Sequence, residues 1–163
     1  MKIETLADLF VEEMQDLYSA ETQLVQALPK MAQAATSPEL QSAFENHLEQ
    51  TKEHVKRIEE IFSYIEGSPK GRKCAAMEGL IKEGKELIGE HMREEVLDAA
   101  LIGAAQRVEH YEIAGYGAAR SHAAHLGYTL VIGLIQQTLD EEKAANEKLT
   151  WIAETGHVNE YAK

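Results

Sequence analysis

The chain has 163 residues, which suits one domain with a substantial core, so we expect residues 1–163 to form a single unit. Its 28 acidic and 16 basic residues give a net charge of −12, which disfavours nucleic acids and anionic membranes as partners. No apolar stretch approaches the ~18 residues of a membrane span, and the acid-rich N-terminal segment is unlike a targeting signal. We therefore expect a cytoplasmic protein.

The apolar residues recur at helical spacing, and Ala, Leu, Glu, Lys and Gln are abundant. This pattern predicts an all-α protein. Breaks at Ser37-Pro38, at the cluster from Gly67 to Gly71, near residues 89–94 and at Gly127 delimit five helices. We expect them at about residues 5–35, 38–66, 75–89, 95–125 and 128–155.

The first two expected helices have clear local signals. Pro29 lies inside the first helix and should kink it, because proline supplies no amide hydrogen. Ser37 is a good N-cap for the second helix, and Pro38 suits its first position.

The third expected helix is short and contains Gly79 and Gly84, so we interpret it as part of a crossover between two helical hairpins. The other four helices, at ~28 residues each, would be ~40 Å long. The predicted fold is a four-helix bundle with a long crossover and an additional short helix.

Three acidic residues fall within the apolar stripes when each helix is projected at 100° per residue. Glu142 lies near the middle of the stripe of the fifth helix, and Glu21 has the same place in the first. Glu112 lies close to the stripe axis of the fourth helix, whereas Glu109 lies one turn earlier at its flank. Glu141 points to the side of its stripe. We therefore expect at least three carboxylates to converge inside the bundle.

The second helix contributes histidines. Thr51 interrupts the centre of its apolar stripe, and His47 and His54 lie one turn on either side, along one edge. An edge histidine in a bundle is more often hydrogen-bonded than bound to metal, so both roles stay open for these two. We expect the remaining histidines and the single cysteine to be structural or exposed: His91, His110, His122, His125, His157 and Cys74, of which Cys74 is structural.

Converging carboxylates require compensation. A lone carboxylate in a low-dielectric core protonates, and several together require cations or shared protons. Two divalent ions would balance four glutamates, and oxygen ligands with optional imidazole suit iron or manganese. We therefore predict two Fe or Mn ions held by Glu21, His47, His54, Glu109, Glu112 and Glu142. The alternative is ion pairing, for which Arg107 and Arg120 are candidates.

Five segments together resemble the YciE/YciF-type stress-response proteins, a ferritin-like family, and the likeness covers nearly the whole chain. The segments are YSAETQLVQALPKMA (18–32), HLEQT (47–51), AMEGLI (76–81), VEHYEIAGYG (108–117) and TLDEEK (138–143). The resemblance implies a ferritin-like, rubrerythrin-like bundle, commonly a homodimer, with a di-metal centre. It places Glu21, Glu109, Glu112 and Glu142 at the family's glutamate positions.

The sequence departs from the expected patterns at two positions. Gln50 stands where the family usually has a glutamate on the second helix, which removes one anionic ligand. Ala145 stands three residues after Glu142, where ordinary di-iron proteins have a histidine. Either the metal affinity is low, or His47 and His54 compensate.

Two functions of different classes follow. The first is an oxidoreductase in which two metals react with peroxide or dioxygen, with an external electron donor because the chain lacks a rubredoxin-like cysteine cluster. The second is a non-catalytic stress-related scaffold or partner-binding dimer with a degenerate metal site. Iron storage and DNA protection are disfavoured, since nothing predicts a shell and the chain is acidic.

Tyr18 and Tyr111 are candidates for hydrogen bonds to carboxylates, with core packing as their default role.

Overall fold

Six α-helices make up the part of the chain that the computed structural model describes, residues 2–163. No strand occurs within these residues, so the all-α prediction is confirmed. The helices are α1 (Leu6–Ala34), α2 (Pro38–Tyr64), α3 (Ala75–Gly89), α4 (Glu94–Leu126), α5 (Thr129–Thr155) and α6 (Val158–Tyr161).

The helix ends follow from local sequence. Thr5 and Asp8 form a reciprocal capping box that starts α1. The Ser37 side chain accepts a hydrogen bond from the amide of Leu40 at the start of α2. Gly127 ends α4 in the left-handed conformation that glycine adopts without strain, at φ 73°. The five predicted helices therefore lie within two residues of the observed ones.

Two local details complete the description of the helices. Pro29 lies inside α1, and the helix continues past it to Ala34. The short helix α6 was not predicted, because four residues are too few to show a helical apolar period. His157, which precedes it, has a positive φ of 62°, and this turns the chain back toward α4.

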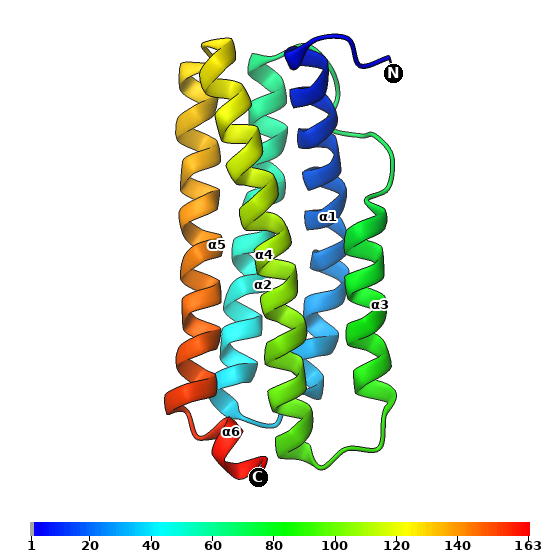
Figure 1. Cartoon of the computed structure of the whole chain (residues 1–163), viewed down its shortest axis with the longest axis vertical. Helices are drawn as coiled ribbons and strands as arrows, with labels where there is room; N and C mark the ends of the chain where they lie inside the picture. Colours follow the sequence, from blue (N-terminus) through cyan, green and yellow to red (C-terminus); the bar gives the residue numbers. More distant parts are fainter. Residues whose placement is uncertain (1) are drawn as a thin grey trace.

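The four long helices form a bundle, and α3 lies outside it (Figure 1). Helix α1 packs against α2, and α4 against α5; α1 also contacts α4, while α2 contacts α5. Residues 65–93 connect α2 to α4, which run in the same direction, and carry α3 along the outer side of α1 and α4 (Figure 1). The predicted bundle with a long crossover is confirmed.

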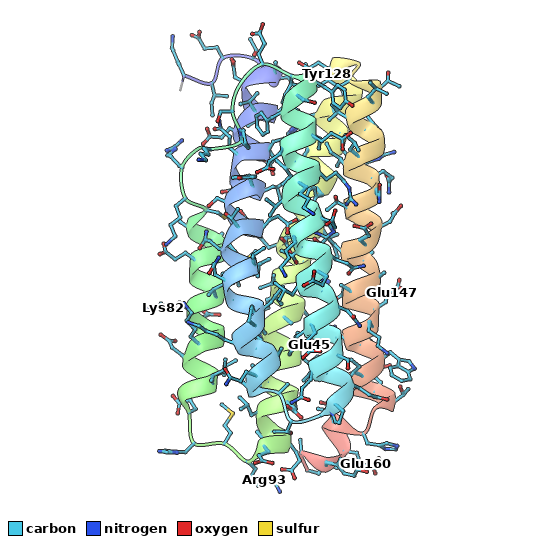
Figure 2. All side chains as sticks on the ribbon, turned by 180° about the vertical axis from the view of Figure 1, so that it is seen from behind. Glu45, Lys82, Arg93, Tyr128, Glu147 and Glu160 are labelled. Atoms are coloured by element: carbon cyan, nitrogen blue, oxygen red, sulfur yellow. The ribbon has the colours of Figure 1, made fainter. Side chains whose placement is uncertain are left out.

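The interior of the bundle has apolar residues at both ends and polar residues between them. One apolar cluster gathers around Phe44, Leu101 and Ile152, near the end where α1 and α5 finish. The other surrounds Phe10 and Tyr116, near the opposite end. The outer surface is strongly charged, as the side chains in Figure 2 show. Among residues 2–163, no helix combines the length and the hydropathy that crossing a membrane requires.

Candidate metal centre

A layer of buried ionisable side chains separates the two apolar clusters. Each of the four long helices contributes to it, and the acids come from the apolar stripes of α1, α4 and α5. We call this layer the carboxylate-histidine cluster; its members are Glu21, His47, His54, Glu109, Glu112 and Glu142. All six are buried, so the prediction that Glu21, Glu112 and Glu142 face inward is confirmed, and the residues expected at the edges of their stripes are buried as well.

Glu142 lies at the centre of the cluster because its two oxygens face different histidines. Its Oε1 atom is 2.9 Å from Nδ1 of His54, and its Oε2 atom is 3.7 Å from Nε2 of His47. The two histidines are seven residues apart on α2, which places them on the same face of that helix. Their ring centroids are 6.4 Å apart. A single carboxylate therefore connects two half-sites.

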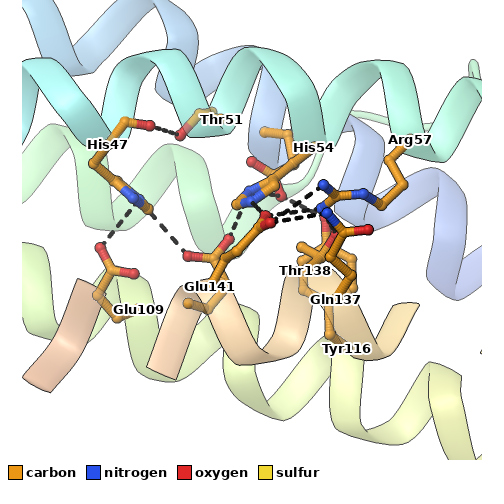
Figure 3. Close-up of polar contacts among 11 residues, drawn as sticks. His47, Thr51, His54, Arg57, Glu109, Tyr116, Gln137, Thr138 and Glu141 are labelled. Carbon is orange, nitrogen blue, oxygen red and sulfur yellow. Dashed lines mark hydrogen bonds and ion pairs between the residues drawn. The ribbon is translucent and has the colours of Figure 1, made fainter. Parts of the chain in front are cut away.

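The half-site at His47 is rich in carboxylates. His47 Nε2 lies 3.3 Å from Glu109 Oε1, and this contact joins α2 to α4 (Figure 3). Glu109 and Glu112 are one helical turn apart, and their ligand atoms lie within 4.8 Å of those of His47 and Glu142. Thr51 hydrogen-bonds to the backbone oxygen of His47 at 2.8 Å, so its hydroxyl serves the helix and not the cluster (Figure 3).

The half-site at His54 is smaller. His54 Nδ1 lies 3.3 Å from Glu21 Oε1, and Glu21, His54 and Glu142 offer ligand atoms within 4.8 Å of one another. The hydroxyl of Tyr116 donates a hydrogen bond to Glu21 Oε1. Tyr116 follows Glu112 by four residues, so helical spacing places both on the same face of α4. Tyr116 was not singled out from the sequence, and this spacing was the available signal that it faces the cluster.

Most polar atoms of the cluster have no hydrogen-bond partner among residues 2–163. They include both oxygens of Glu112 and Glu142, both ring nitrogens of His47, and Nδ1 of His54. His54 Nδ1 and Glu142 Oε1 are close, yet their orientation does not satisfy hydrogen-bond geometry. Buried polar atoms are almost always paired, because an unpaired one costs about 1–3 kcal/mol.

This arrangement fits a pair of metal ions. The unpaired atoms of each half-site converge on a common region, and the donor set is four carboxylates with two imidazoles. Oxygen-rich ligation with imidazole suits iron or manganese. The charge balance also fits, since two divalent ions would neutralise four glutamates.

The pKa values of the cluster reflect its burial. Burial raises the pKa of Glu109 well above its ordinary range, and the charge of Glu142 adds to this effect. Burial likewise raises the pKa of Glu112, helped by the charges of Glu21 and Glu142. Burial opposes the charged form of His54, but the carboxylates of Glu21 and Glu142 outweigh it and raise its pKa to about 11.

Two further acids show opposite shifts. Burial raises the pKa of Glu21, although His54 partly opposes this. Burial also acts to raise the pKa of Glu142, but His54 and His47 beside it prevail and lower that pKa below its ordinary value. In the absence of cations, the cluster therefore shares protons unevenly, and Glu142 is its most persistent anion.

Glu141, a carboxylate outside the cluster, binds the nitrogen of His54 that faces away from the cluster. Glu141 Oε2 accepts a hydrogen bond from His54 Nε2 at 2.7 Å (Figure 3). Arg57 donates to both oxygens of Glu141, at 2.9 and 3.3 Å, and Gln137 donates to Oε1 at 3.2 Å. Because Nε2 is occupied in this way, His54 presents Nδ1 to the cluster.

The two arginines named as candidates for ion pairing do not pair with the cluster in the part of the chain that the structure describes. Arg107 and Arg120 are exposed, and within residues 2–163 neither forms an ion pair with the cluster. The arginine that lies beside the cluster is Arg57, through Glu141. Its role could not be inferred from α2 alone, because it depends on how α2 and α5 pack.

Tyr18 and Tyr111, the candidates for hydrogen bonds to carboxylates, donate to acids outside the cluster. Tyr18 donates to Glu59 at 2.9 Å, and Tyr111 donates to Asp16, so both serve acids outside the cluster. Cys74 is buried, and its sulfur accepts a hydrogen bond from the Met77 amide at the start of α3, which confirms its structural role.

The side chains at the two departure positions do not enter the cluster. Gln50 is exposed and Ala145 is half-buried, and both line a surface groove beside His47. Four of the five remaining histidines are exposed and His122 is half-buried, as expected for residues outside the cluster.

The fold and this site agree with comparisons to known proteins. Residues 5–163 match the family described as "Domain of unknown function (DUF892)", and the chain belongs to that family. It is similar to Protein YciF of Escherichia coli (strain K12), with 46% identity over 164 residues that cover 100% of this chain and 98% of the relative. The resemblance to YciF-type proteins predicted from the sequence is thereby confirmed.

Two solved structures share the fold over most of the chain. The crystal structure of the E. coli stress protein YciF matches with a TM-score of 0.92 and 44% identity, covering 97% of this chain and 99% of that one. YcfI from Rhodopseudomonas palustris, provisionally described as a structural protein, matches with a TM-score of 0.89 and 42% identity, covering 91% and 95%.

Proposed function

We propose that this protein is a ferritin-like stress protein that holds two iron or manganese ions in its carboxylate-histidine cluster and reacts there with peroxide or dioxygen. The observation that carries the proposal is the convergence of buried, unpaired oxygen and nitrogen atoms around Glu142. A cytoplasmic location and a homodimer remain predictions.

Each half-site has its own set of residues for one ion. His47, Glu109 and Glu112 would hold one ion, Glu21 and His54 the other, and Glu142 would be shared. Two such ions, when bound, supply the electrons that reduce an oxidant. The chain's own residues orient the site and close it along the bundle axis: Glu141 fixes His54, Tyr116 donates to Glu21, and an apolar cluster lies on either side.

A non-catalytic scaffold is the second candidate, and the raised pKa values favour it. If Glu109 and Glu112 carry protons at neutral pH, the cluster persists without metal ions as neutral acids around an ionised Glu142 that is paired with protonated His54. The provisional description of YcfI as a structural protein is consistent with this candidate.

Metal counting separates the two functions. Protein stripped with a chelator is incubated with Mn(II), or anaerobically with Fe(II), and its metal content and melting temperature are measured. The proposal expects two ions per chain and a higher melting temperature, because a ligand that binds the folded state stabilises it. Glu142→Gln should lose both effects, whereas Glu147→Gln, an exposed residue of the same helix, should keep them.

The reaction is tested separately. Fe(II)-loaded native protein should consume peroxide faster than the Glu142→Gln variant. If the native protein binds two ions but consumes peroxide at the same rate as the variant, the protein has a metal site without the proposed reaction. If the native protein binds metal no better than Glu142→Gln does, and chelators leave its melting temperature unchanged, the scaffold function is supported instead.

A further inference from the structure

An open groove runs along the surface between α2 and α5 and reaches the cluster. Its volume is about 520 Å³, and its lining includes Phe44, His47, Gln50, Glu109, Ala145 and Leu149. His47 and Glu109 both belong to the larger half-site. On α5, the small side chains of two consecutive alanines, Ala144 and Ala145, form part of its wall.

The exposed fractions of the cluster residues are consistent with access through the groove. His47 is 6% exposed and Glu109 is 2% exposed, whereas the other four members are 0% exposed. The side of His54 is closed by Glu141, which is held by Arg57. Within the described part of the chain, solvent therefore meets the cluster at the His47 half-site alone.

From this asymmetry we infer that the groove is the entry route for an external ligand, which binds the ion held by His47 and Glu109 and not the ion held by Glu21 and His54. The inference rests on the proposed function, since it requires bound metal. It adds that the two ions are unequal: one is open to exchange and the other is enclosed.

The groove also defines the class of ligand. A water molecule takes up about 30 Å³ of liquid, so a volume of about 520 Å³ admits molecules larger than hydrogen peroxide. Lys148 contributes a positive charge to the lining and Glu39 a negative one, while Gln50 and Asn46 contribute amides. The ligand is therefore a small molecule with one oxygen or nitrogen donor that binds the metal directly, and azide is a suitable probe.

The test uses full-length protein loaded with Co(II), whose visible absorption responds to its ligands. Metal content is counted first, and azide is then titrated while the spectrum is recorded. We expect one azide per chain that carries two cobalt ions. Ala145→Phe should keep the cobalt content and weaken azide binding at least tenfold, because the ring fills the groove. Ser42→Phe, on the opposite wall, provides a second obstruction if the first variant fails to fold.

A control variant places the same ring elsewhere. Ala114 is exposed on α4 and does not line the groove, so Ala114→Phe should retain native azide affinity. Three outcomes would overturn the inference while leaving the metal site intact. They are native azide affinity in folded groove variants, no azide response, and two azides per chain. If the native protein binds no cobalt, the proposed function fails and the entry route fails with it.

Discussion

His54 Nε2 lies 2.7 Å from Glu141 Oε2, and this contact determines which nitrogen of the ring faces the cluster. Glu141 is itself held by Arg57 at 2.9 Å. Although Glu141 precedes Glu142 in the chain, it points away from the half-sites and acts on them only through the ring of His54. The two neighbouring acids thus have different roles, one as a shared ligand and the other as a positioning residue.

Glu141→Gln should weaken Mn(II) binding by about 10- to 100-fold, the range found for residues that orient metal ligands. An amide accepts the His54 hydrogen bond more weakly and removes the charge that raises the basicity of the ring. The dissociation constant is measured by titration, with Glu147→Gln as the control. Unchanged affinity would show that Glu141 only pairs with Arg57.

The stability of the metal-free protein should fall as the pH rises from 5 to 8. The pKa values of Glu109, Glu112 and His54 are raised in the folded state, so the folded chain binds more protons than the unfolded chain in this range. Their stabilising contribution is complete below the unfolded pKa values and is lost as the pH rises through the folded ones. The pKa of Glu142 is lowered from 4.5, so its contribution changes only at lower pH and does not affect this range.

Melting temperatures of chelator-treated protein across this range provide the measurement. Glu112→Gln mimics a protonated acid, so it should flatten the dependence and abolish the stabilisation by Mn(II). A native curve that rises with pH, or a variant with the same slope as the native protein, would contradict the assigned protonation.

Much of this site could be predicted from helical periodicity alone. The projection places Glu21, Glu112 and Glu142 on apolar stripes, and each is fully buried. Helix boundaries were equally accessible, because Ser37, Pro38 and Gly127 have strong local preferences.

The remaining features depend on how neighbouring helices pack. Glu109 was expected at the flank of its stripe, yet it is 2% exposed because that flank of α4 faces His47 on α2. The interaction of Glu141 with His54 likewise joins two helices. Periodicity gives the direction of a side chain from its own helix axis, and it does not give the partner that the side chain meets.

Asp98 connects α4 to the loop between α1 and α2, and its removal should destabilise the fold. Its carboxylate accepts hydrogen bonds from the amides of Thr36 and Ser37 and from the Thr36 hydroxyl, each at 2.8 Å. Asp98→Ala leaves these donors without their partner, so the free energy of unfolding should decrease by about 3 kcal/mol. Denaturant unfolding measures this decrease.

Asp140 offers a comparison for that experiment, because it is exposed on α5 and, within residues 2–163, its side chain accepts a hydrogen bond from Gln136 alone, one turn earlier. Asp140→Ala should change the free energy of unfolding by no more than about 0.5 kcal/mol. Equal losses in the two variants would mean that the Asp98 hydrogen bonds contribute little to stability.

Restoring a carboxylate at position 50 should strengthen metal binding only modestly. Gln50 lines the groove beside His47 and Glu109, but its side chain is exposed, so a charge there acts largely through solvent. An exposed charge interaction contributes about 0.2–1 kcal/mol, so Gln50→Glu should lower the Mn(II) dissociation constant by up to about fivefold. Gln33→Glu makes the same charge change at an exposed position of α1 outside the groove and should have no effect. A much larger gain for Gln50→Glu would mean that the new carboxylate turns inward and joins the His47 half-site as a ligand.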